Sequence, residues 1–206
     1  MSLKVNVVYR KTEKKDREAI AEFIEKHYSS SWECDSESMV RRLCRLYFYD
    51  YMINGSQMYT AEYRDQTVGV IAASKNGGSR VAPVYRLKRL YTLLRLKMTK
   101  EGRLNLDNLK QKKEMENELL TAQSGLKGSR ILFFYVEKNY CRNGIGTELL
   151  KMLEKEEADG LYACLDQTEH ADFMKKHGFR KVSQREKMME INKRRFRETV
   201  SLWQNK

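Results

Sequence analysis

The chain has 206 residues, of which 41% are hydrophobic and 33% charged, with one proline and eleven glycines. This balance is typical of a globular domain and excludes collagen-like, low-complexity and intrinsically disordered chains. The formal net charge of +12 is confined to residues 77–128 and 180–206, because the remaining residues sum to −1. Such an excess fits either a polyanionic partner or a phosphate-bearing cofactor.

No run of apolar residues is long enough for a signal peptide or a membrane span. We therefore expect a cytoplasmic protein that makes no contact with a membrane. The four cysteines are widely and irregularly spaced and form no CxxC pair: Cys34, Cys44, Cys141 and Cys164. Because structural zinc sites cluster their ligands, this spacing predicts free thiols and no metal site.

The first part of the chain alternates between strand and helix signals. A β-branched run at residues 5–9 predicts a strand. Apolar residues at helical spacing predict helices at 16–28 and from about residue 35 to the Asn54-Gly55 turn. Residues 58–63 and 68–73 then predict a β-hairpin.

Residues 77–128 interrupt this alternation with a basic, leucine-rich segment that opens on Gly77-Gly78-Ser79. Pro83 stands where the first residue of a helix is expected. A helix ending at Lys100–Gly102 is predicted by apolar residues at helical spacing: Leu87, Leu90, Leu94 and Met98. A polar helix is predicted from about Leu106 to Ala122. Since structureless loops of this length are uncommon, we expect a helical insertion within one domain of residues 1–206.

A buried strand that runs through a glycine turn directly into a helix is the strongest local pattern. Residues 131–136 are nearly all apolar, which is typical of a strand buried on both faces, and an amphipathic helix follows from Gly146 to about Glu157. The first N–H groups of such a helix have no intrahelical acceptor and lie at its positive end, which suits phosphate. Leu149 occupies the last glycine position of a GxGxxG motif and no GK[ST] ending is present, so neither a dinucleotide fingerprint nor a P-loop is predicted.

The remaining elements are short. The sequence predicts a strand at 161–165, a helix at 171–177 and two alternating strands at 187–191 and 196–202, joined by a turn at Asn192-Lys193. Strands and helices thus alternate irregularly, with hairpins near both ends. This order favours an α/β layer fold with a mixed sheet.

Two segments together resemble a known family. The pattern Val-x-x-x-Tyr-x-x-x-Gly-Ile-Gly-x-x-Leu-Leu at residues 136–150 resembles motif A of the GNAT superfamily of N-acetyltransferases. Residues 173–179, Phe-Met-Lys-Lys-His-Gly-Phe, resemble the later F-Y-x-K-x-G-F segment of that family. The resemblance covers residues 1–76 and 129–206. It implies a mixed, mostly antiparallel central sheet that splays at the motif A strand, with helices on both faces and the helical insertion added.

The resemblance also implies that the protein binds acetyl-CoA. The turn amides would hold the pyrophosphate, and the open edge of the motif A strand would pair with the pantetheine amides. The implied coenzyme-binding residues are Tyr135, Val136, Lys138, Arg142, Asn143, Gly144, Ile145, Gly146 and Thr147. A substrate amine would then attack the thioester after losing a proton to a base or a water chain.

The sequence departs from the family pattern at two positions. Cys141 stands where the family usually has Arg or Gln in the turn, and Met174 replaces the tyrosine that protonates the leaving thiolate. Methionine cannot donate a proton. The candidate substitutes are Tyr135, Tyr140, Tyr162 and His170. Glu137 and Asp166, each at the end of a strand, are candidate bases, and Cys164 is expected to be a core residue.

The implied function is transfer of an acetyl group from acetyl-CoA to a primary amine of a small molecule, protein or peptide. The acceptor side would be formed by aromatic residues of the first helices: Tyr28, Trp32, Tyr47 and Tyr51. The alternative is a non-catalytic acyl-CoA-binding or interaction module, which Met174 favours. For the insertion, the readings left open are a helix pair packed on the body or in a homodimer, a lid over the substrate cleft, and a surface for an acidic partner. Nucleic-acid binding is not expected, because no aromatic-basic RNA motif is present.

Overall fold

The computed structural model describes residues 6–29, 32, 34, 36–75, 83–123, 125–166, 170–191 and 194–205. The strands are β1 (Val8–Lys11), β2 (Gln57–Tyr63), β3 (Gln66–Ser74), β4 (Ser129–Val136), β5 (Leu161–Leu165), β6 (Arg180–Ile191) and β7 (Arg194–Asn205). The α-helices are α1 (Arg17–Tyr28), α2 (Glu37–Asn54), α3 (Val84–Lys97), α4 (Lys100–Ala122), α5 (Ile145–Glu156) and α6 (Ala171–Lys176). Short 3₁₀ turns, η1 (Lys14–Asp16) and η3 (Lys138–Tyr140), precede α1 and follow β4.

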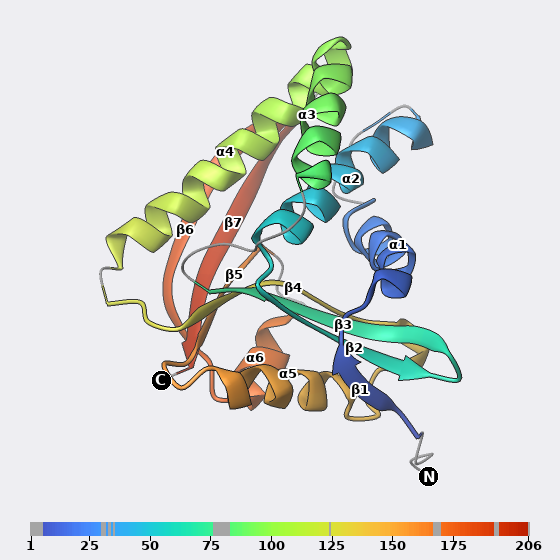
Figure 1. The fold of residues 1–206 in the computed structure, drawn as a ribbon. Helices are drawn as coiled ribbons and strands as arrows, with labels where there is room; N and C mark the ends of the chain where they lie inside the picture. Colours follow the sequence, from blue (N-terminus) through green and yellow to red (C-terminus); the bar gives the residue numbers. More distant parts are fainter. Residues whose placement is uncertain are drawn as a thin grey trace.

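The seven strands form one sheet in the order β1-β2-β3-β4-β5-β7-β6. Every neighbouring pair in the sheet is antiparallel except β4 and β5, which are parallel. Helices cover both faces of the sheet, with α1 and α2 on one side and α5 and α6 on the other (Figure 1). The mixed, mostly antiparallel sheet expected from the sequence is therefore confirmed.

Each face of the sheet has its own apolar core. On the first face, Phe23 and Phe48 from the two helices pack with Phe133 of β4. On the other face, Leu149 and Leu153 of α5 pack with the strands, and α5 lies close to Gly69 of β3. A Cβ atom at Gly69 would lie 3.2 Å from a methyl group of Leu149, so the helix and the sheet are in tight contact.

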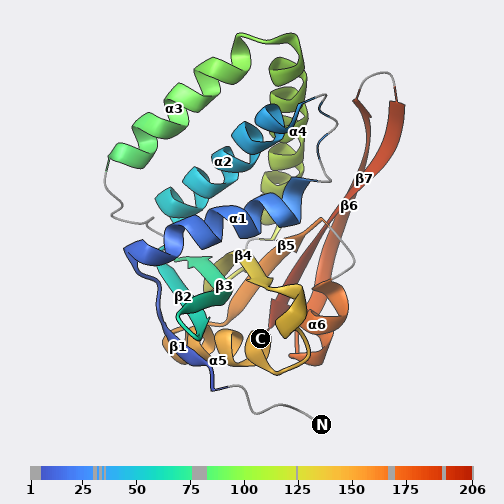
Figure 2. The same ribbon diagram turned by 90° about the vertical axis from the view of Figure 1, so that its right-hand side faces the viewer.

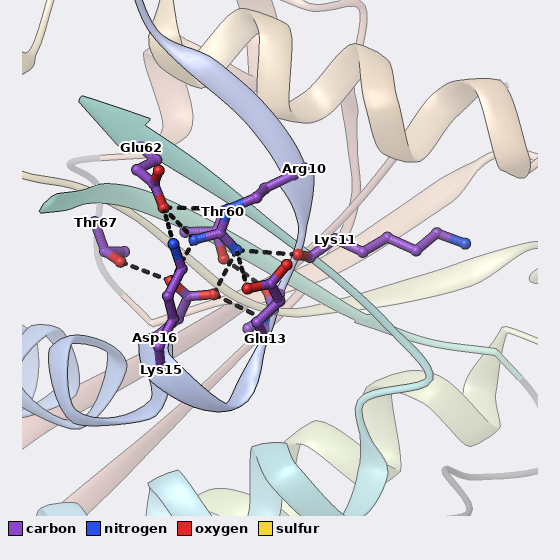
Figure 3. Close-up of polar contacts among 9 residues, drawn as sticks. Arg10, Lys11, Glu13, Lys15, Asp16, Thr60, Glu62 and Thr67 are labelled. Carbon is purple, nitrogen blue, oxygen red and sulfur yellow. Dashed lines mark hydrogen bonds and ion pairs between the residues drawn. The ribbon is translucent and has the colours of Figure 1, made fainter. Parts of the chain in front are cut away.

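A charged cluster fixes the first strand to the first helix (Figure 3). The Arg10 guanidinium donates to both carboxylate oxygens of Asp16, at 2.7 and 2.8 Å, and also pairs with Glu62 of β2. Thr67 of β3 donates to Asp16 at 3.0 Å. Asp16 is buried, and its partners hold β1, the start of α1 and the β2–β3 hairpin together.

Helices α3 and α4 occupy the segment predicted as a helical insertion and stand above α2 and α1 (Figure 2), and α4 lies next to the β6–β7 hairpin. The sequence correctly predicted two helices here, but the boundary between them was wrong. The helix α4 begins at Lys100, because Thr99 caps it and accepts a hydrogen bond from the N–H of Gly102 at 3.0 Å. Thus Lys100–Gly102 starts the second helix and does not end the first.

The C-terminal hairpin, β6–β7, is longer than the two alternating runs of the sequence predicted, since its strands span 180–191 and 194–205. Its turn at Asn192-Lys193, the glycine break at Gly77–Ser79 and the first residue of the 5–9 run lie outside the described residues. None of the helices in the described ranges is long and apolar enough to cross a lipid bilayer.

Candidate functional site

The turn between β4 and α5 presents backbone groups to solvent. Arg142 and Gly144 have positive φ angles, 65° and 80°, and Gly144 is the N-cap of α5 without a side-chain cap. The Asn143 side chain donates to the carbonyls of Tyr140 and Cys141 at 3.3 and 3.5 Å and so braces the turn. The N–H groups of the first helical turn have no intrahelical acceptor, so they are available to an anion.

Glycine stands at positions 144 and 146 of this turn for two different structural reasons. A Cβ atom at Gly144 would meet no heavy atom within 4 Å, so the space beside the turn is open to a ligand. A Cβ atom at Gly146 would lie 2.9 Å from the Phe134 ring and 3.3 Å from the Phe173 ring. Gly146 is therefore required by packing between α5, β4 and α6, whereas Gly144 leaves room at the helix N-terminus.

Thr147 has a partner that the sequence did not suggest. The carbonyl of Phe173 accepts from His177 Nδ1 at 2.8 Å, because a carbonyl has no proton to give. In neutral His177, Nε2 is then an acceptor, and the Thr147 hydroxyl donates to it at 3.0 Å. In that tautomer the Thr147 hydroxyl proton is directed at the imidazole of His177 and not at the turn.

Strand β4 separates from β5 after only three paired residues. Ser129, Arg130 and Ile131 pair with residues 161–163. Beyond them, in the described part of the chain, residues 132–136 of β4 have no strand partner on the β5 side. The register with β3 also shifts by one residue at Leu132, which is the signature of a β-bulge. The result is a sheet that splays open at β4, as the resemblance implied.

The ladder shows which backbone groups face the open side. The N–H of Glu137 donates to the carbonyl of Val68 at 2.9 Å, one residue beyond the pair of Val136 and Gly69. In an antiparallel ladder this marks a non-hydrogen-bonded pair, so the N–H and C=O of Val136 point away from β3. By alternation those of Phe134 do so as well, whereas those of Tyr135 point toward β3.

The expected coenzyme-binding residues lie differently relative to the open edge. The backbone N–H and C=O of Val136 lie on this edge, whereas those of Tyr135 are turned toward β3. Lys138 lies beyond the end of β4, in the turn η3, so it is not part of the strand edge. Phe134, which the sequence analysis did not name, also has its backbone groups on the open edge.

The splay opens into two adjoining cavities. A small one, of about 50 Å³, lies between the ends of β4 and β5 and is also lined by His27, His170 and Met174. A larger one, of about 260 Å³, lies between α2, α4 and the same strands. The two share Tyr28, Leu132 and Asp166 in their walls, so the gap in the sheet leads directly into the larger cavity.

Three of the four expected acceptor-side aromatic residues line the larger cavity. The rings of Tyr28 and Tyr47 stack at 4.3 Å, and the hydroxyls of Tyr28 and Tyr51 are 2.8 Å apart. Burial raises the pKa of each of these tyrosines well above its usual value, so all three are neutral phenols. Trp32 packs against Tyr47 outside the cavity wall.

Helix α4 closes the other side of this cavity with charged residues that are already paired. Lys112 bridges Asp166 and Glu198, Lys113 pairs with Asp50, and Glu116 accepts from Arg130 at 2.6 Å. Asp50 also pairs with Arg89 of α3. Each of the three carboxylates in the wall thus has a cationic partner, and the lining is neutral overall.

The two candidate bases are both engaged in ion pairs. Burial acts to raise the pKa of Asp166, but the charge of Lys112 and its hydrogen bond outweigh this effect, so the pKa lies below its usual value. Asp166 is therefore a poor proton acceptor, although it lies at the splay. Glu137 pairs with Lys26 of α1 at 2.8 Å and lies at the far end of β4, outside the walls of both cavities.

The other proton-transfer candidates also separate by position. Burial raises the pKa of Tyr135, which packs against Phe23 at 4.8 Å, while Tyr140 packs against Tyr63 near the turn. Burial raises the pKa of the Tyr162 phenol too, and that residue is absent from the walls of both cavities. Of the substitutes named from the sequence, only His170 lines the gap between the strands.

Cys164 and Met174 line the cavities as apolar or inert groups. Burial raises the pKa of the Cys164 thiol to about 11, so it stays protonated and is a poor nucleophile. Met174 is buried in the gap, at the place where the resemblance puts a tyrosine.

His27 is the residue at the gap that the sequence analysis did not name, although it did name His170. His27 comes from the end of α1 and His170 from the start of α6, and their rings stack at 5.5 Å. Their positions, 143 residues apart, carry no shared motif, because they meet only through the packing of α1 and α6 on opposite faces of the sheet, beside the same part of β4. Lys112 was missed for the same reason.

Comparison with known proteins supports the architecture. Neither a scan against family models nor a search of curated proteins gave a match. Solved structures match over nearly their whole length. A histone acetyltransferase HPA2 and related acetyltransferase from Corynebacterium glutamicum has a TM-score of 0.55 and 11% identity, and the match covers 97% of this chain and 96% of that chain.

Two other structures are similar to the same extent. NAA60 from Arabidopsis thaliana in complex with acetyl-CoA has a TM-score of 0.52, 13% identity and coverage of 97% and 98%. A ribosomal-protein-alanine N-acetyltransferase from Brucella melitensis has 0.51, 15% and coverage of 96% and 98%. Together with the splayed sheet and the glycine turn, these matches show that the chain has the fold of the GNAT-family acetyltransferases.

Proposed function

We propose that the protein is an N-acetyltransferase that transfers the acetyl group of acetyl-CoA to a primary amine. The observation that carries this proposal is the continuous path formed by the turn, the open edge and the cavity. The helix N-terminus at Gly144 suits a pyrophosphate, Val136 and Phe134 offer backbone groups for pantetheine amides, and the path ends at the splay. A structure of the same fold contains acetyl-CoA, which supports the choice of co-substrate.

The acceptor that fits the larger cavity best is a small amine. The volume of this cavity, about 260 Å³, is below the range of ordinary drug-sized sites. Helix α4 forms one wall of this cavity, with Lys112, Lys113 and Glu116 in its lining. Since Asp50, Glu116 and Asp166 already pair with cations, the wall offers no free carboxylate to a polyamine. We infer a neutral or zwitterionic acceptor.

For the chemistry, His170 is the proton acceptor that the geometry favours. The amine nitrogen attacks the thioester carbon, the C–S bond breaks, and the amine proton passes to the imidazole directly or through one water. The stacked His27 ring would fix the orientation of His170. Because Met174 cannot protonate the leaving thiolate, we expect that proton to come from solvent or from His170 itself.

Calorimetry with acetyl-CoA tests the coenzyme site. Gly144→Val should abolish binding by filling the space beside the turn. Gly178→Val is the matched control, because Gly178 has nearly the same φ angle, 82°, and equally open surroundings, but lies away from the turn. Loss of binding in both variants, or in neither, would contradict the assignment.

Turnover with a panel of acceptors tests the reaction itself. We expect release of free thiol with small amines and none with peptides bearing a free N-terminus. Binding of acetyl-CoA without thiol release for any amine would instead establish the alternative, a non-catalytic acyl-CoA-binding module.

A further inference from the structure

Helix α3 exposes an unusual amount of apolar surface. Nine large apolar side chains are exposed in the described residues, and six of them belong to this helix or to its C-cap residue, Met98. These six are Val84, Leu87, Leu90, Tyr91, Leu94 and Met98. Met98 is 79% exposed and Leu87 66%. This face is exposed because α3 packs on α2 and α4 through its other side, where Tyr85, Thr92 and Leu96 are buried.

The spacing of the exposed residues is regular. Val84, Leu87, Tyr91, Leu94 and Met98 follow one another at intervals of three, four, three and four residues, which is the a and d pattern of a coiled coil. Such a seam is the surface that a second helix packs against with its own apolar stripe. Scattered apolar residues on a surface are ordinary, but a continuous seam along a whole helix marks an interaction site.

The charges beside the seam all have one sign. In the a/d register, Lys88 and Arg95 occupy e positions and Lys97 a g position, and α3 contains no Asp or Glu. All three basic side chains are exposed. Charges at e and g set which helix can pair with which, so a partner helix must carry acidic residues at the facing positions.

The same charges argue against the other occupants of this seam. In an antiparallel dimer of two α3 helices, the basic e residues Lys88 and Arg95 would face each other, and in a parallel dimer neither they nor Lys97 would meet an acidic residue. A lipid surface would accept any apolar face and does not call for a three-four repeat. We propose that α3 is a docking surface for an acidic amphipathic helix of a partner protein.

The proposal does not depend on acetyl transfer. The seam lies on the side of α3 opposite to Tyr85, Thr92 and Leu96, which face the body, and none of its residues lines either cavity at the splay. The docking surface therefore stands if the proposed enzymatic activity fails, and the reverse is also true.

A designed peptide serves as the probe. It contains three heptads with Leu at a and d and Glu at e and g, and its control differs only in having Lys at e and g. In fluorescence anisotropy with the full chain at low salt, we expect the Glu peptide to bind at least about tenfold more tightly than the Lys peptide. The preference should weaken as salt is added.

Two variants of the protein sharpen the test. Leu87→Glu/Leu94→Glu should lose the Glu peptide, whereas Val182→Glu/Met188→Glu, on an exposed part of β6, should keep it. Charge reversal by Lys88→Glu/Arg95→Glu/Lys97→Glu should transfer the preference to the Lys peptide. Circular dichroism melts confirm that the variants are folded, which is expected because all the changes lie at exposed positions.

Four results would overturn the proposal. The first is equal affinity for the two peptides, and the second is unchanged peptide binding by the Leu87→Glu/Leu94→Glu variant. The other two results would identify another occupant of the seam. A wild-type dimer in sedimentation that the Leu87→Glu/Leu94→Glu variant does not form would assign the seam to a second copy of the chain. Co-sedimentation of the wild type, but not the variant, with phosphatidylserine vesicles would assign it to a lipid surface.

Discussion

The ion pairs of the structure separate the two candidate bases named from the sequence from the histidines at the gap between β4 and β5. Asp166 is held as a carboxylate by Lys112, and Glu137 is paired with Lys26 away from the cavities. His27 and His170 also line this gap, with their rings stacked on each other. The proposed reaction uses His170 of this pair as its proton acceptor.

Replacement of His170 tests this assignment. His170→Gln should lower kcat by about 10²-fold while the affinity for acetyl-CoA is unchanged, because the imidazole acts on the amine proton and not on the coenzyme. The acidic limb of the pH–rate profile should change as well, because a general base acts in its unprotonated form. Glu137→Gln is the matched comparison, and a larger loss of kcat in that variant than in His170→Gln would show that Glu137 is the base.

At the scale of elements, the junction of α3 and α4 depends on a helical glycine. A Cβ atom at Gly102 would lie 2.1 Å from the carbonyl oxygen of Leu96 and 2.6 Å from the hydroxyl of Thr99, which caps α4. The chain reverses direction between the two helices at this point. The close contact explains why a residue with poor helix propensity stands in the first turn of a 23-residue helix.

Replacing Gly102 by alanine should destabilise the protein, although replacing a glycine inside a helix by alanine ordinarily stabilises it. Gly102→Ala would gain about 1 kcal/mol of helix propensity but must displace backbone, so we expect a net loss of about 2 kcal/mol in the free energy of unfolding. Urea denaturation measures it. Gly125→Ala, where the added methyl meets nothing within 4 Å, should change stability by less than about 0.5 kcal/mol. A stabilised Gly102→Ala protein would refute the contact.

For the whole molecule, the charged cluster at Asp16 links stability to pH. Burial acts to raise the pKa of Asp16, but hydrogen bonds from Arg10, the N–H of Glu13 and Thr67 outweigh it, so the folded pKa is below the usual value. A lowered folded pKa adds stability that is complete above the unfolded pKa of about 4 and is lost as pH falls through the folded pKa. The cluster therefore stabilises the fold at neutral pH and fails in acid.

Removal of this carboxylate should cost stability in a pH-dependent way. Asp16→Asn leaves Arg10 without its main partner, and we expect a loss of about 3 kcal/mol at pH 7. The difference between wild type and variant should shrink as pH falls below about 4. Thermal melts at pH 7, 4 and 3 measure it, with the exposed Asp172→Asn as the control. A difference that is constant with pH would exclude the linkage.

Much of the architecture was predictable because local physics decides it. The bounds of the strand at 161–165 and most helices followed from apolar spacing, and the turn at Gly144 followed from a strand that runs into a helix through glycines. Two helices between β3 and β4 were predicted correctly, but the boundary between them was wrong because Thr99 was not recognised as a cap. The exposed side of α3 could not be predicted, since a stripe of Leu residues gives no sign of which side of a helix faces the body.

The sequence by itself determined the order of elements, the glycine turn and the family that these resemble, because helix periodicity, capping and turn conformation depend on neighbouring residues. Only the tertiary structure decided which side chains share a site. Lys112 neutralises Asp166, and His27 meets His170, because α4 and α1 pack over the ends of strands far away in the chain. Ion pairing and burial arise from such long-range packing, so the pairing of Asp166 and the exposure of the seam of α3 could not be predicted from the sequence.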